Sequence, residues 1–184
     1  MDLDEKARGH VRGMLEAIGD NPERDGLLET PARVVESWHE LFAGYQQDPV
    51  DIFKTFDVEH SQMVVLKHIE FYSMCEHHVL PFFGRATIGY LPRGRVVGIS
   101  KLARLLDIYA RRLQVQERMG EQIADALEKH LAPTGCGIVL EAQHLCMTAR
   151  GVGKQNSLMR TQTLRGTFLH DEQVRSEFLD AVRR

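Results

Sequence analysis

The order of apolar segments after residue 61 constrains the fold more than any other feature of this sequence. MVVLKHIEF and RATIGYL have the composition of strands, and so do the later segments GIVLEAQHLCMTA and RTQTLRGTF. Between the two pairs, apolar residues keep helical spacing from Ser100 to Leu131, and RRLQ near residue 112 is expected to divide this stretch into two helices. RVVGI is a third strand or a continuation of the second. The order predicts an α+β fold: an antiparallel sheet with two helices on one face.

The two ends of the chain carry helical patterns. Residues 1–55 are predicted to form a helical extension, and residues 56–184 the main domain. In TPARVVESWHELFAGY, Thr30 is the expected N-cap, and Pro31 takes the first helical position. DEQVRSEFLDAVRR is expected to end the chain as an amphipathic helix.

The bulk composition excludes several classes of function. A net charge of −3 gives no general attraction to nucleic acid or to an anionic membrane, so neither is an expected partner. No apolar run approaches the length of a membrane span, and MDLDEKARGH lacks the apolar core of a signal peptide. Three cysteines are too few for a disulfide scaffold, which favours a reducing cytoplasm.

The segment FYSMCEHHVLPFFG points to a metal site. Cys75 and His78 have C-x-x-H spacing, which lets both side chains reach one ion from a turn. His144 and Cys146 are two positions apart on a predicted strand, so both are expected to face the interior. Cys75, His78 and Cys146 form a Cys₂His set, which suits zinc and leaves a fourth coordination position open, as in catalytic zinc sites.

Less specific interpretations of these residues stay open at this point. The cysteines and histidines could be ordinary core residues, as we expect for Cys136. His77 and His144 lie beside the predicted metal, and an unperturbed imidazole can give or take a proton near neutral pH, so a hydrolytic site with two proton-transferring histidines is one interpretation. Either histidine could instead be a fourth ligand that closes a structural site.

Basic and polar residues suggest a phosphorylated substrate. Ser100, Lys101 and Arg104 begin a predicted helix, where backbone N–H groups and the helix dipole favour an anion. Arg150 and Lys154 follow the predicted metal strand, although solvated surface charge is the simpler explanation for any one of them. In QVQERM, the carboxylate of Glu117 either stabilises the start of its helix or accepts two N–H bonds from a guanine edge.

Three long motifs together resemble the GTP cyclohydrolase I family. They are SMCEHHVLPFFG, VVGISKLARLLDIYARRLQVQERM, and EAQHLCMTARGVGKQNS through TLRGTF, in the family's order and spacing. The resemblance implies the tunnelling fold, in which subunit sheets join into an annular barrel and two rings form a homodecamer. It also implies conversion of GTP to 7,8-dihydroneopterin triphosphate and formate, the first step of tetrahydrofolate and pterin biosynthesis.

The resemblance assigns roles residue by residue. The implied zinc ligands are Cys75, His78 and Cys146, and the implied catalytic residues are His77, His144 and Ser100. The implied guanine and triphosphate contacts are Gln116, Glu117, Lys101, Arg104, Arg150 and Arg33, the last reaching a neighbouring subunit. Leu113 and Gly153 depart from the family's usual proline and basic residue.

The implied mechanism is hydrolytic. Zinc activates water for attack on guanine C8, His144 or His77 protonates the ring nitrogen, and Ser100 assists the later ribose rearrangement. Rival interpretations are another enzyme of the same fold, either a pterin-forming paralogue with a different metal or a nitrile reductase for a deazaguanine, and a non-catalytic zinc-stabilised binding or regulatory protein. RATIGYL and RTQTLRGTF are expected to leave open sheet edges that pair between subunits.

Overall fold

The computed structural model describes residues 3–59 and 62–183. The chain forms two compact units, Met1–Ala43 and Gly44–Arg184, which are described separately. The predicted domain boundary between residues 55 and 56 stays a prediction. Within the described ranges, no helix combines the length and hydrophobicity required to span a bilayer.

The first unit is a pair of helices, α1 (Leu3–Ala17) and α2 (Thr30–Leu41). The two helices contact each other, and each has one buried residue, Val11 in α1 and Val35 in α2. The predicted N-cap of α2 is wrong by one residue: Glu29 holds the N-cap position, and no side chain caps the helix there.

The second unit begins with two short 3₁₀ helices, η1 (Ala43–Gln46, whose first residue belongs to the first unit) and η2 (Pro49–Ile52). Its main sheet has the strand order β5-β2-β3-β6-β7. The strands are β2 (Val64–Cys75), β3 (Leu80–Leu91), β5 (Leu113–Gln114), β6 (Gly135–His144) and β7 (Met159–Gly166).

This sheet matches the predicted antiparallel pattern for its four long strands. It differs from the prediction in β5, which pairs in parallel with the end of β2. RVVGI contributes β4 (Arg95–Val97), which forms a separate two-stranded sheet with β1 (Thr55–Asp57). The predicted open edge at RATIGYL is wrong, because β3 lies between β2 and β6. RTQTLRGTF does supply the edge strand β7.

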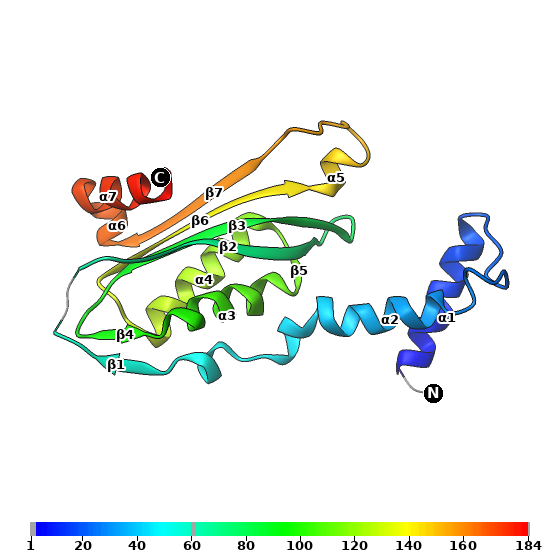
Figure 1. Ribbon diagram of the computed structural model, residues 1–184, viewed down its shortest axis with the longest axis horizontal. Helices are drawn as coiled ribbons and strands as arrows, with labels where there is room; N and C mark the ends of the chain where they lie inside the picture. Colours follow the sequence, from blue (N-terminus) through cyan, green and yellow to red (C-terminus); the bar gives the residue numbers. More distant parts are fainter. Residues whose placement is uncertain (1–2, 60–61, 184) are drawn as a thin grey trace. The chain divides into compact units, whose positions relative to one another are not determined.

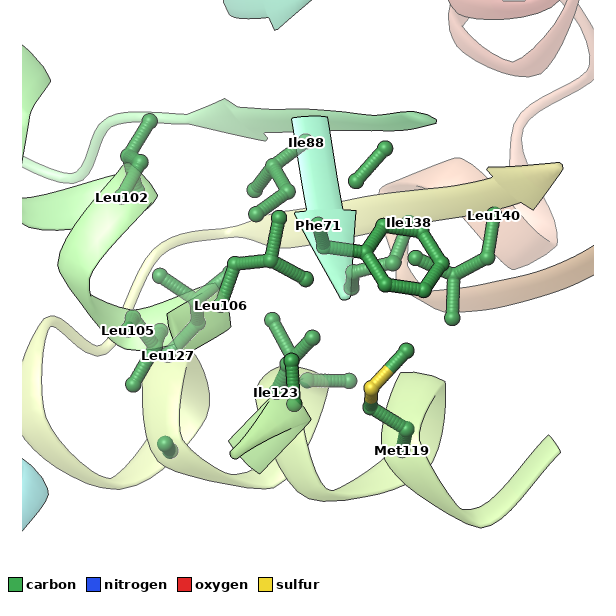
Figure 2. Close-up of a cluster of buried hydrophobic side chains, with 14 of the residues drawn as sticks. Phe71, Ile88, Leu102, Leu105, Leu106, Met119, Ile123, Leu127, Ile138 and Leu140 are labelled. Carbon is green, nitrogen blue, oxygen red and sulfur yellow. The ribbon is translucent and has the colours of Figure 1, made fainter. Parts of the chain in front are cut away.

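Two helices cover one face of the sheet, as the sequence predicts (Figure 1). They are α3 (Ile99–Ala110) and α4 (Gln116–His130), separated at the expected RRLQ segment. Their apolar stripes meet the alternate residues of β2, β3 and β6 that point toward them. Figure 2 shows this core, which includes Phe71, Ile88, Leu102, Leu105, Leu106, Met119, Ile123, Leu127, Ile138 and Leu140.

The opposite face carries the C-terminal helices α6 (Thr167–His170) and α7 (Glu172–Arg183) (Figure 1). Phe178 of α7 is fully buried there. Its ring occupies the space left by Gly89 and Gly137, where an added Cβ would come within 2.8 Å and 2.6 Å of ring carbons. The two glycines therefore provide the depression that seats α7 on the sheet.

Candidate metal centre and active site

Three side chains with donor atoms for a soft metal converge at one end of the main sheet. Cys75 is the last residue of β2, His78 lies in the turn before β3, and Cys146 lies in the short helix α5 (Leu145–Thr148). Their ligand atoms all lie within 4.8 Å of one another. Tetrahedral zinc with bonds of about 2.0–2.3 Å requires donor separations of roughly 3.5–4 Å. Small side-chain adjustments would therefore fit the three donors to one ion.

The expected location of Cys146 on a strand is wrong. β6 ends at His144, and the chain turns directly into α5. The shared direction of His144 and Cys146 therefore does not come from strand alternation. Both residues nevertheless line the same pocket, because the helical turn brings Cys146 back toward Cys75.

The thiols differ in their electrostatic surroundings. Burial and the neighbouring Cys75 raise the pKa of Cys146, so a second negative sulfur is unfavourable there without a compensating cation. Cys136 is fully buried in β6, and burial raises its pKa to about 12. Cys136 is therefore an inert core residue, whereas Cys75 and Cys146 lie close enough to each other and to His78 to share one ion.

His144 is held on two sides. Its ring stacks on Phe82, with 4.5 Å between centroids and 3° between planes, because the two residues are partners in the β3–β6 register. Its Nε2 lies 2.8 Å from Oε1 of Gln116. Burial lowers the pKa of His144, and the nearby charge of Glu117 opposes this shift.

Gln116 is buried behind His144, at the first position of α4. Its Nε2 donates to Leu140 O at 3.1 Å, Met159 O at 3.2 Å and Thr161 Oγ1 at 3.1 Å. Every polar atom of the side chain thus contacts a protein group. Its predicted contact with guanine stays a prediction, and this geometry gives its side chain a different set of partners.

An ion pair fixes the turn that carries the two adjacent histidines. Arg118 of α4 binds the carboxylate of Glu76, and its Nε donates to Oε1 of Gln114 at 3.3 Å. The hydrogen bond from Arg118 is the main cause of the lowered pKa of Glu76. His77 is exposed in this turn, with Nε2 3.9 Å from Glu76 Oε1. The first turn of α4 therefore contacts both segments that carry the histidines: Gln116 binds His144, and Arg118 binds Glu76 in the turn of His77 and His78.

A pocket of about 370 Å³ opens beside the metal-ligand cluster. Glu117 is exposed at the start of α4, close enough to act electrostatically on His144. Arg150 contacts the cluster at His78, with Nη1 3.5 Å from His78 Nε2. The pocket is lined by Ala142, His144, Cys146, Met147, Ser157, Leu158 and Met159.

Three predicted substrate residues lie away from this cluster. Ser100 and Lys101 begin α3, which ends just before β5, beside Cys75 (Figure 1). The helix alone separates its N-terminus from that end of the sheet by about 16 Å. Arg104 lines a different pocket of about 340 Å³, together with Asp107 and Arg111. One copy of the chain therefore does not bring these residues to the metal-ligand cluster.

Three further residues that the sequence analysis named are Arg33, Gly153 and Lys154. Arg33 belongs to the first unit, where its guanidinium pairs with Glu29. Gly153 has φ +60°, a conformation that favours glycine over the basic residue expected from the family pattern. Lys154 is exposed in the same loop.

Sequence reasoning missed Phe82, Glu76 and Arg118. The stacking of Phe82 on His144 depends on strand register, which the sequence does not reveal. Arg118 carried a weak signal, because it directly follows Gln116 and Glu117 in a segment already singled out. Its partner Glu76 is 42 residues away, so the pair becomes visible only in the folded chain.

Comparison with known proteins decides the family. The family model described as GTP cyclohydrolase I matches residues 7–183. The chain belongs to the GTP cyclohydrolase I family. The protein named GTP cyclohydrolase 1 from Wolinella succinogenes is 55% identical over 175 residues, which cover 94% of each chain. That from Campylobacter lari is 49% identical over 182 residues, which cover 98% of this chain and 96% of the relative.

Further comparisons agree with membership of the GTP cyclohydrolase I family. The GTP cyclohydrolase 1 of Thermobifida fusca is 53% identical over 175 residues, 94% of this chain and 84% of that protein. A crystal structure of the archaeosine synthase QueF-Like in the apo form aligns with 59% of this chain and 97% of its own. With a TM-score of 0.47 and 17% identity, that alignment adds nothing to the assignment.

Proposed function

We propose that this chain is a zinc-dependent GTP cyclohydrolase I that converts GTP and water to 7,8-dihydroneopterin triphosphate and formate. Membership of the family supports the reaction, the first step toward tetrahydrofolate and pterins. The observation that carries the proposal is the convergence of Cys75, His78 and Cys146 beside the half-buried His144. We further propose a cytoplasmic location, because the thiols must stay reduced to bind metal.

Cys75, His78 and Cys146 would hold the zinc ion. Two thiol groups and one imidazole within 4.8 Å are a donor set that suits zinc over magnesium or calcium. Three protein ligands leave room for water, and zinc supplies a lowered pKa of that water and polarisation of the reacting centre. Burial and the neighbouring Cys75 raise the pKa of Cys146, so a bound cation would be needed to favour its thiolate.

The chain's own histidines would move the protons. His144 lines the pocket and is held by Phe82, which favours delivery of a proton to the opening imidazole ring of guanine. His77 is exposed in the turn next to His78 and would serve the later proton transfers. Ser100 would assist the ribose rearrangement that precedes closure of the pterin ring.

Charged residues would bind the two ends of the substrate. The carboxylate of Glu117 would accept the guanine N1–H and exocyclic amine. Gln116 would support the same part of the site. The triphosphate would contact Lys101, Arg104, Arg150 and Arg33.

Assembly would complete the active site. The distance between the cluster and the N-terminus of α3 supports contributions from different subunits. Two sheet edges support the assembly: β7 is an edge strand, and β5 covers only Met74 and Cys75 of β2. We propose the tunnelling fold, with sheets joined into a ring and two rings forming a homodecamer.

We therefore expect light scattering to give a mass close to ten times the 21.0 kDa subunit. Dilution until the assembly dissociates should abolish turnover, because each site would lose Ser100, Lys101 or Arg104 of its neighbour. A monomer with full activity would refute shared active sites.

The reaction is tested by incubating the purified enzyme with GTP. We expect equimolar formate and a product that becomes fluorescent after oxidation, as pterins do. Metal bound without formate release would indicate the non-catalytic zinc protein instead. Nicotinamide oxidation with a nitrile substrate would indicate a reductase, which needs a free nucleophilic cysteine. Cys75 and Cys146 are in the metal-ligand cluster, and Cys136 is buried with a pKa of about 12.

A further inference from the structure

The amide of Gln116 has a defined orientation. Its Nε2 faces two carbonyl oxygens, of Leu140 and Met159, which can only accept hydrogen bonds. The reversed amide would place Oε1 against both carbonyl oxygens, where no hydrogen bond can form, which is unfavourable. The NH₂ group therefore points to the carbonyls, and Oε1 points to His144.

This orientation fixes which nitrogen of His144 carries a hydrogen. An amide oxygen cannot donate, so the 2.8 Å contact requires His144 Nε2–H to donate to Gln116 Oε1. In the neutral ring, Nδ1 is then the bare nitrogen. Within residues 3–59 and 62–183, Nδ1 has no hydrogen-bond partner. The stacking of Phe82 on the ring, at 3° between planes, also holds the ring against tilting.

We propose that Gln116 is a positioning residue that holds His144 as the Nε2–H tautomer and leaves Nδ1 as the ring nitrogen available to the substrate. The inference rests on the proposed function for the identity of the substrate.

Because Gln116 is fully buried, its side chain can position His144 but is not placed to contact the substrate. Its side chain is 0% exposed and lies outside the set of residues that line the pocket. A guanine contact through the amide would require Gln116 to abandon His144 or the carbonyls. Glu117, the next residue, is exposed and has a carboxylate available for the base.

Neutron diffraction of the zinc-loaded parent enzyme tests the tautomer directly. At a pH where His144 is neutral, we expect deuterium on Nε2, directed at Gln116 Oε1, and none on Nδ1. Deuterium on Nδ1 alone would overturn the proposal. This measurement needs no variant and no turnover, so it decides the tautomer even if GTP is not the substrate.

Gln116→Met tests the positioning role, because Met has a similar length and no hydrogen-bonding group for His144. We expect kcat for formate release to fall by about 10²-fold, the scale of general acid–base catalysis, while KM for GTP changes less than about threefold. The matched control is Gln173→Met, an exposed residue of α7, which should keep the parent kcat.

The pattern of kinetic changes separates the outcomes. A large rise in KM with an unchanged kcat would show that Gln116 binds guanine, and would overturn the positioning role. An unchanged kcat and KM would overturn it as well. If Gln116→Met does not fold, the neutron result on the parent decides the proposal. No formate from the parent enzyme would reject the proposed function and leave the tautomer assignment standing.

Discussion

Cys146→Ser is expected to remove the metal ion and to abolish formate release from GTP. A serine hydroxyl stays protonated near neutral pH and is a poor zinc ligand, so Cys75 and His78 would remain as a two-residue set. Because zinc supplies the activated water, loss of the ion should reduce turnover to background. Metal analysis of the purified protein, together with formate measurement, gives both results from one sample.

Cys136→Ser is the matched control, because it makes the same change outside the metal-ligand cluster. Cys136 is fully buried in β6, so its hydroxyl is expected to cost roughly 1–3 kcal/mol of stability while the metal content stays at the parent level. Retention of one zinc ion per chain and of parent activity in Cys146→Ser would exclude Cys146 as a ligand.

Glu117→Gln is expected to reduce GTP turnover by about 10⁴-fold and to leave the fold and the metal content intact. One carboxylate can accept both the N1–H and the exocyclic amine of guanine, whereas the amide keeps one acceptor and turns an N–H group toward the base. Sites built on paired hydrogen bonds discriminate at about this level. ATP presents an unprotonated N1 and lacks the 2-amino group, so the parent should release no measurable formate from ATP.

Glu128→Gln provides the comparison on the same helix, where the side chain is exposed. It should behave like the parent in kinetics and metal content. If Glu117 only stabilises the N-terminus of α4, its removal should cost about 0.3–1 kcal/mol and leave kcat unchanged. Parent-level turnover of GTP by Glu117→Gln would remove guanine recognition from this residue.

Periodicity in the sequence predicted the parts of the fold whose side chains share one face. The four long strands and the helices α3 and α4 follow from spacing, because each buries an apolar face against the same core. β1 and β5 were missed, since three- and two-residue strands are too short to show alternation. Their structure depends on tertiary pairing, which local sequence does not encode.

The candidate site, like the fold, could be predicted from the sequence only in part. Cys75, His78 and Cys146 were grouped by residue type and spacing, and their ligand atoms do converge. The stated reason for Cys146 was wrong, because β6 gives way to a helical turn after His144. The partners of Gln116 were not predictable, since they come from β6 and β7, which lie 24 to 45 residues farther along the chain.

The first turn of α4 also sets a limit on insertions and deletions. Gln116, Glu117 and Arg118 take three directions: one binds His144, one is exposed, and one binds Glu76. Successive helix residues differ by about 100° around the axis, so the loss or gain of one residue within this turn would rotate all three roles at once. A carboxylate would then take the buried position of the amide. Related sequences should therefore tolerate a change of length in the exposed segment 151–156, and none within residues 114–118.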